Sequence, residues 1–335
     1  MNFSPELSTM IAVAMSLTAA FMWGSWLISL KYLGDYPLDG FFVTQFITSF
    51  IFVWSVGFTL DGPALLGNIR QVYATDPSRV VVTLVCGVMY VIGMRLSLFV
   101  VKTIGLSLSQ PIGSSVNILG GTLVAALVGG VPARLSPLKI ALVVILLVGA
   151  VTASMISGKL HTKNREQSEY KSGLNYTMKD LWRALGLALF AAAFIPAYTI
   201  GISYGLHSIT QPNGLAVLPF MALLVSGAFT GAMLGSGLLL TINKQWSIIF
   251  HAPMSVHKFG IISGLFHYGG NIIHTFATAS LSSVVSWPLG ITASLWTQLW
   301  GLVYGELRGA PRRAYLALFL SIAFYLLGTY VIAFK

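Results

Sequence analysis

Two 27-residue stretches decide the fold of this chain, because they superpose without a gap at an offset of 177 positions. Residues 87–113 read GVMYVIGMRLSLFVVKTIGLSLSQPIG, and residues 264–290 read GLFHYGGNIIHTFATASLSSVVSWPLG. The superposition matches the one proline of each stretch and pairs Gly87 with Gly264, Gly93 with Gly270, Ser109 with Ser286, Pro111 with Pro288 and Gly113 with Gly290. A match at a fixed offset predicts an internal repeat.

The whole chain is strongly apolar. Its 335 residues are 56% hydrophobic and 8% charged, with a mean hydropathy of +0.82. A soluble chain carries about 25% charged residues. The composition therefore excludes an ordinary cytosolic enzyme, a disordered protein and a secreted disulfide scaffold, and the single cysteine, Cys86, has no partner in the chain.

Ten apolar runs are long enough to cross a bilayer as helices, which takes about 20 residues each. Their hydrophobicity is continuous, which argues against a β-barrel with its alternating strands. No Lys or Arg precedes the first run, so we interpret it as a span and not as a cleaved signal peptide. The sequence predicts an all-α polytopic membrane protein with spans at residues 8–30, 41–60, 79–102, 105–129, 136–157, 180–205, 214–241, 257–279, 282–304 and 313–334.

One long polar stretch divides these runs into two groups of five. It covers residues 158–179 and separates a first repeat at 1–157 from a second at 180–335. An odd number of spans in each half would insert the two halves in opposite orientations. Inverted repeats of this kind allow alternating access to a site near mid-membrane.

The basic residues indicate the orientation. Thirteen Lys and Arg residues fall in one set of loops, five fall on the opposite face, and Arg95 lies inside a span. The positive-inside rule places the thirteen, together with the 158–179 loop, in the cytoplasm and both termini outside a cell membrane. The net charge of +10 then reflects loops at the membrane and does not indicate nucleic acid.

Polar residues follow one face of the eighth run. Their steps of +4, +4, +3 and +4 keep them on one side of a helix: Ser263, His267, Asn271, His274 and Thr278. Such a stripe should face the bundle interior, either lining a solute path or only forming hydrogen bonds between helices. A metal or haem site is not expected, because His267 and His274 are seven residues apart.

Further candidate solute ligands lie in the other spans. Trp23, Trp26 and Trp296 sit at hydrophobic depth, where an indole could stack on a sugar or planar heterocycle or simply pack in the core. Arg95 could bind a polar solute or reach the cytoplasmic surface. The remaining two candidates flank a proline-weakened stretch of the fourth span: Gln110 and Asn117.

Acidic residues are scarce in the spans, which limits the choice of proton carriers. The candidates are His267, His274 and Glu306, with Asp61 at a span boundary. The chain has no phosphate-binding loop, no cofactor motif and no Cys/His pattern of a metal site. Gly227, Gly231 and Gly235 form a small-residue face for helix packing, within this chain or in a homodimer.

Three segments resemble a known family. Residues 22–26, MWGSW, resemble the Gly-Ser/Thr-Trp signature of sugar and ureide carriers in the drug/metabolite transporter superfamily. Residues 92–96, IGMRL, and 105–123, GLSLSQPIGSSVNILGGTL, resemble spans three and four of the plant ureide permeases. They are also similar to the bacterial rhamnose–proton symporter and glucose/ribose uptake proteins. Met94 stands where the ureide pattern has Asn.

The resemblance implies import of a small neutral polar solute, commonly together with protons. From the sequence we expect a secondary transporter for a monosaccharide or a ureide- or nucleobase-like compound, and not an enzyme. The alternatives are an exporter of drugs or amino acids from the same superfamily, an intramembrane enzyme that uses the span-eight histidines, and a non-transporting membrane scaffold.

Overall fold

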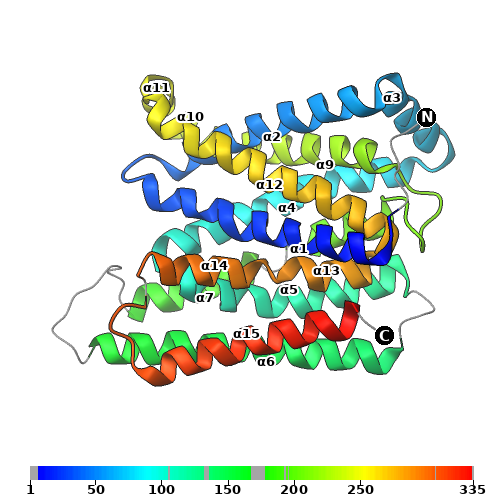
Figure 1. The fold of residues 1–335 in the computed structure, drawn as a ribbon. Helices are drawn as coiled ribbons and strands as arrows, with labels where there is room; N and C mark the ends of the chain where they lie inside the picture. The colour runs from blue at the N-terminus through cyan, green and yellow to red at the C-terminus, as the bar shows by residue number, and fades with distance from the viewer. Residues whose placement is uncertain are drawn as a thin grey trace.

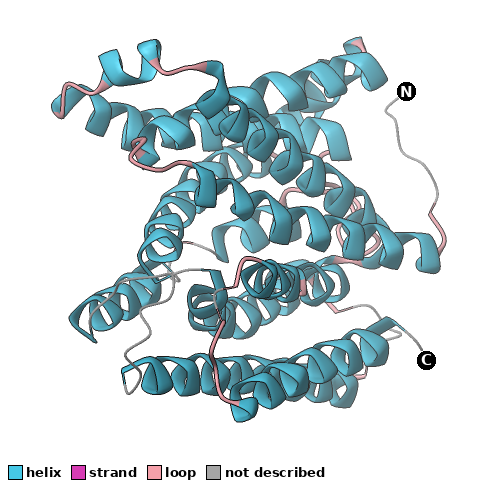
Figure 2. Cartoon of the chain, turned by 60° about the vertical axis from the view of Figure 1, so that its left-hand side comes forward, coloured by secondary structure: helices cyan, strands magenta, loops and turns pink. Residues whose placement is uncertain are grey.

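The computed structural model describes residues 7–104, 106–131, 136–166, 178–191, 194, 196–305 and 307–333. These residues are helical apart from short connections (Figure 2). Within the described ranges, extended pairing is limited to two isolated bridges, Leu206–Leu215 and Ser208–Gln211. The all-α class predicted from the sequence is therefore confirmed.

The axes of the long helices are roughly aligned with one another, and shorter helices connect some of them (Figure 1). In chain order they are α1 (Thr9–Ser25), the 3-10 helix η1 (Trp26–Tyr32), α2 (Leu38–Asp61), α3 (Pro63–Thr75), α4 (Pro77–Ile104), α5 (Leu106–Gly129), α6 (Pro137–Glu166), α7 (Met178–Ala191), α8 (Pro196–Tyr204), α9 (Val217–Ala232), the π-helix η2 (Met233–Gly237), α10 (Leu238–Ile242), α11 (Trp246–His251), α12 (Met254–Leu281), α13 (Ser283–Ile291), α14 (Ala293–Val303) and α15 (Arg312–Ala333).

Four helical segments of the described chain are long and apolar enough to cross a membrane: Thr9–Tyr32, Leu38–Asp61, Pro77–Thr103 and Val217–Ile242. The 28-residue α12 is as long as α4 but carries the polar stripe, and it is not among the four. These helices fit a membrane protein of the all-α class.

Several predicted runs are interrupted in the structure. The run at 180–205 is split into α7 and α8, and Pro196 begins the second helix, where a missing N–H costs no hydrogen bond. The run at 282–304 is likewise split into α13 and α14, and a π-helical turn interrupts the run at 214–241. The short helices α3 and α11 were not predicted.

The fifth predicted run ends later than expected. Helix α6 continues nine residues past residue 157, to Glu166, and so enters the predicted linker. Lys, Arg and Glu are good helix formers, so polarity alone does not end a helix. Residues 167–177 of that linker lie outside the described residues, and its last two residues begin α7.

Helix α12 packs against α1, α2 and α13. Helix α4 packs on α9, α8 and α7, while α6 and α15 lie side by side along one edge (Figure 1). Glycines allow the closest approaches. A Cβ at Gly87 of α4 would meet the backbone of Leu224 on α9, and one at Gly264 of α12 would meet the backbone of Gln45 on α2.

Candidate functional site

The polar stripe of α12 faces the interior of the bundle. Its five members are at most 2% exposed: Ser263, His267, Asn271, His274 and Thr278. Small neighbours make this possible, because Gly264 and Gly270 on the same helix leave room for α2 and for the Trp23 ring of α1. The sequence pattern thus buries two imidazoles and an amide among packed helices.

His267 has polar partners on both ring nitrogens. Its Nε2 lies 2.8 Å from the Tyr90 hydroxyl on α4, and its Nδ1 lies 3.3 Å from Gln45 Nε2 on α2. The Trp26 ring stacks on the imidazole with centroids 5.2 Å apart. If the Gln45 amide donates to Nδ1, then Nε2 carries the imidazole proton and donates to Tyr90.

His274 is held two turns further along α12. Its Nε2 lies 3.1 Å from the Ser286 carbonyl on α13, and a carbonyl can only accept, so Nε2 carries the proton. Its Nδ1 accepts from the Tyr198 hydroxyl of α8 at 3.3 Å. The ring also packs against Trp23, with centroids 4.8 Å apart. In the neutral imidazole, these contacts favour the tautomer that carries its proton on Nε2.

Trp23 and Asn271 connect the two histidines. Trp23 Nε1 donates to Asn271 Oδ1 at 2.8 Å and lies 3.3 Å from the carbonyl oxygen of His267. We call this group the His–Trp cluster, and its members are Trp23, Trp26, Gln45, Tyr90, Tyr198, His267, Asn271 and His274.

Three buried polar atoms near these contacts have no hydrogen-bond partner among the described residues. They are Asn271 Nδ2, Gln45 Oε1 and Asn117 Oδ1. An unsatisfied buried donor or acceptor costs about 1–3 kcal/mol, so such atoms are readily explained by a ligand. Asn117 lies next to the cluster, because its carbonyl accepts from Trp287 Nε1 at 3.2 Å and Trp287 packs on Tyr198.

The sequence-based candidates therefore separate into groups. Trp23, Trp26, His267, Asn271 and His274 come together, and Asn117 lies close by. Trp296 is 38% exposed and packs edge-on against Phe21, away from these side chains. The side chain of Gln110 and the whole of Glu306 lie outside the described residues.

Arg95 forms an ion pair with Asp39, and its hydrogen bonds in the described part of the chain go to Asp39 and Ser236 and not to the cluster. Its Nε lies 2.7 Å from Asp39 Oδ1 and its Nη2 lies 3.0 Å from Asp39 Oδ2. Asp39, Gln45, Tyr90 and Tyr198 were not among the candidates predicted from the sequence. Only Tyr90 carried a signal, because the 177-residue offset superposes it on His267.

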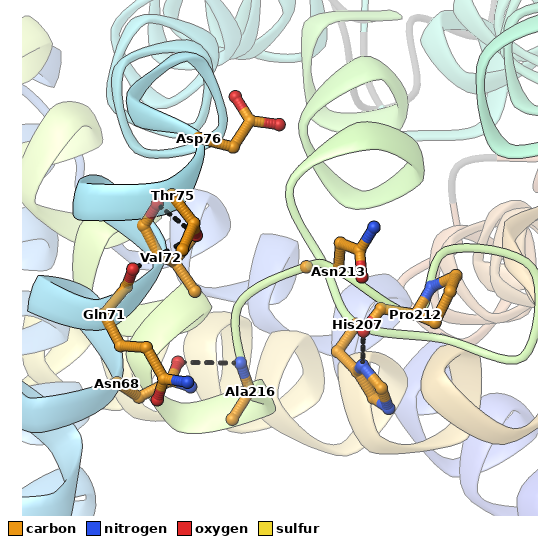
Figure 3. A pocket seen from close by; sticks show the side chains of 10 residues that line it. Asn68, Gln71, Val72, Thr75, Asp76, His207, Pro212, Asn213 and Ala216 are labelled. Carbon is orange, nitrogen blue, oxygen red and sulfur yellow. Dashed lines mark hydrogen bonds between the residues drawn. The ribbon is translucent and has the colours of Figure 1, made fainter.

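A separate pocket of about 760 Å³ opens between α3 and the 205–216 connection (Figure 3). Its wall combines apolar groups with the polar side chains of Asn68, Gln71, His207 and Asn213. Asn68 Oδ1 accepts from the Ala216 amide at 3.0 Å, and His207 Nδ1 donates to the Pro212 carbonyl at 2.6 Å. None of the His–Trp cluster residues lines this pocket.

The chemistry of the cluster is neutral. It offers amide, hydroxyl and imidazole hydrogen bonds beside indole rings, and no carboxylate, ammonium or guanidinium group is a member. Across the described ranges, no three His, Cys, Asp or Glu side chains gather closely enough to hold a metal ion.

Comparison with known proteins supports the fold. No family model matches this sequence, and no curated protein matches it. A solved crystal structure, described only as that of a protein, is similar with a TM-score of 0.59 and 14% sequence identity, over 96% of this chain and 96% of that chain. At this identity, the likeness shows the fold alone.

Proposed function

We propose that this chain is a secondary transporter that imports a small neutral polar solute, together with protons, by alternating access. The observation that carries the proposal is the buried, uncharged His–Trp cluster. Its members come from both halves of the chain: Trp23, Trp26, Gln45 and Tyr90 from the first, and Tyr198, His267, Asn271 and His274 from the second. A solute held there would be enclosed between the halves.

The helix boundaries support two repeats at the offset found in the sequence. Helices α4 and α12 begin at residues 77 and 254 and end at residues 104 and 281, and both pairs are 177 positions apart. Helices α5 and α13 begin at 106 and 283, again 177 apart. Two copies of one fold would have helices of equal length that begin and end at corresponding positions.

Packing between the halves supports the same proposal. Helix α4 of the first half packs on α9 of the second, and α12 of the second half packs on α2 of the first. The contacts use corresponding glycines, Gly87 and Gly264. Helices α6 and α15, which end the two halves, pack on each other. Such reciprocal pairing fits ten spans arranged as two inverted five-helix repeats.

The lining favours a neutral solute with several hydroxyl or amide groups. Trp23 and Trp26 provide ring faces, and Asn271 and Gln45 provide an unpaired donor and an unpaired acceptor. Monosaccharides and ureide- or nucleobase-like compounds combine such groups with a flat or apolar face. A charged solute would meet no opposite charge in the cluster.

Two measurements test this function. The first is the thermal stability of the purified protein in the presence of D-glucose, L-rhamnose, allantoin or uracil. The second is uptake of any stabilising compound into proteoliposomes. We expect one compound to stabilise and enter, and we expect Asn271→Ala and His267→Ala to abolish both effects while still inserting into membranes. The exposed Asn243→Ala is the matched control and should behave as the wild type. Normal uptake by both cluster variants would refute the site.

A further inference from the structure

A buried glutamine lies outside the His–Trp cluster. The Gln298 side chain of α14 is 2% exposed, and neither its Nε2 nor its Oε1 has a hydrogen-bond partner among the described residues. Each unsatisfied buried polar group costs about 1–3 kcal/mol. Because both polar atoms of one amide are unsatisfied, Gln298 lowers the stability of the solute-free chain, and a ligand for the amide would remove that cost.

Close packing of α14 on α1 fixes the depth of Gln298. Gly24 leaves room for the backbone of α14, which a Cβ at this position would meet. Thr297 Oγ1 donates to the Gly24 carbonyl at 3.2 Å, and Trp300 Nε1 donates to Ser25 Oγ at 2.9 Å. Gln298 lies between these two contacts along α14, and therefore at the depth of Gly24 and Ser25.

Gln298 lies on the face of α14 that α5 covers. Thr297 and Trp300 mark the face that packs on α1, and Gln298 follows Thr297 about 100° further round the helix. This second face is also buried, and it carries Ser294 and Gly301 as well. The long helices that pack on α14 are α1 and α5, so α5 covers the amide (Figure 1).

A second unsatisfied amide atom lies at a similar depth on α5. A Cβ at Gly129 would meet Ser283 at the start of α13, while Asn117, earlier on α5, binds Trp287 further along α13, so the two segments run in opposite directions. From the first contact, Asn117 is 12 residues away and Gln298 is 15, or about 18 and 22 Å along the axes. Asn117 Oδ1 and the Gln298 amide therefore lie within about one helical turn in depth.

Both amides lie beside the His–Trp cluster. Asn117 is connected to the cluster through Trp287, whose ring packs on a cluster tyrosine. Gln298 is connected through α1, because Ser25, which binds α14, directly precedes Trp26. The unsatisfied atoms of α5 and α14 therefore border the proposed solute site.

We propose that Gln298 is a further solute ligand, an inference that rests on the proposed transport function. One edge of its amide presents a donor and an acceptor together, so it binds a neutral group that offers an acceptor and a donor side by side. The C=O and N–H of a cyclic ureide or nucleobase have this arrangement, and so do two neighbouring hydroxyls of a sugar. Asn117 Oδ1 accepts a further hydrogen bond from the same molecule.

The thermal stability of Gln298→Met tests one consequence without any solute. Methionine has about the volume of glutamine and needs no hydrogen bond, so this variant removes the unsatisfied amide. We expect it to melt about 2 °C above the wild type in detergent. Gln45→Met is the matched control and should melt below the wild type, because Gln45 Nε2 lies 3.3 Å from His267 Nδ1. A lower melting temperature for Gln298→Met would assign the amide a structural partner and would overturn the proposal.

Binding of uracil, allantoin, D-glucose and L-rhamnose to the purified protein tests the other consequence. We expect Gln298→Met to bind the compound that stabilises the wild type about tenfold more weakly. Stabilisation by uracil, and not by its dimethylated form with both ring N–H groups blocked, would assign the amide edge. Stabilisation by a sugar would assign neighbouring hydroxyls. Equal affinity of the wild type and Gln298→Met for the effective compound would overturn the proposal.

Asn271→Ala separates a failure of this inference from a failure of the proposed function. Loss of binding in Asn271→Ala together with unchanged binding in Gln298→Met would overturn the role of Gln298 alone. Loss of binding in both variants, without uptake by wild-type proteoliposomes, would contradict transport and keep Gln298 as a ligand. Absence of stabilisation of the wild type by every compound would overturn both.

Discussion

Tyr90 and His267 lie 177 positions apart in the chain, and the Tyr90 hydroxyl lies 2.8 Å from His267 Nε2. This separation equals the offset at which residues 87–113 superpose on residues 264–290. Equivalent residues of two repeats related by a twofold axis can touch only where they approach that axis. The contact is therefore what the proposed inverted repeat, with a solute site between its halves, would produce.

Tyr90→Phe should reduce uptake about tenfold, because it removes a partly buried hydrogen bond to His267 that is worth about 1–1.5 kcal/mol. Uptake by proteoliposomes measures the effect. Tyr268→Phe is the matched control, because Tyr268 is fully buried and its hydroxyl has no hydrogen-bond partner. Equal uptake by the two variants would contradict the role given to Tyr90.

Gly87→Ala and Gly264→Ala should each destabilise the protein by about 1–3 kcal/mol, because the new methyl group would meet facing backbone on α9 or α2. Thermal unfolding in detergent would detect the loss. Gly67→Ala on α3, where a Cβ would meet nothing within 4 Å, should be neutral or stabilising. Wild-type melting temperatures for both Gly87→Ala and Gly264→Ala would argue against the close packing of α4 on α9 and of α12 on α2.

Ser282→Gly should stabilise the protein. Ser282 connects α12 to α13 with φ 75° and ψ 159°, a backbone conformation essentially restricted to glycine that costs about 1–3 kcal/mol in other residues. Its hydroxyl is buried without a hydrogen-bond partner, so little is lost with the side chain. Ser283→Gly is the contrasting variant, because Ser283 accepts from Ser203 at 2.8 Å, and it should unfold at a lower temperature than wild type.

Acidification should weaken the connection between α3 and α4. The Ser78 hydroxyl, and next Arg79, hold the pKa of Asp76 below its usual value. The stabilisation is therefore present above the unfolded pKa of about 3.9 and is lost as the pH falls through the lower folded value. The difference in melting temperature between wild type and Asp76→Asn should shrink over that range, and a constant difference would contradict the assignment.

The sequence was sufficient for much of the fold and for part of the site. Apolar run length predicted the long helices, and the +4, +4, +3, +4 spacing predicted the buried stripe on α12. Periodicity within one helix reports which residues share a face, because that depends only on helix geometry.

Partners on other helices could not be predicted in this way. Asp39 and Arg95 are 56 positions apart, and Gln45 and His267 are 222 apart, so only the packed structure brings them together. Trp296 is a second example. Its position within an apolar run made it a candidate ligand, but the run could not show that its ring packs on Phe21. Tyr90 alone was accessible, through the repeat offset.

Counterflow in proteoliposomes tests the central claim most directly. Vesicles are loaded with the unlabelled compound that stabilises the protein, diluted, and given a trace of the same compound in radiolabelled form outside. The account predicts transient accumulation of intact labelled compound inside wild-type vesicles and none with Asn271→Ala. Binding without entry, or recovery of a chemically altered compound, would contradict it.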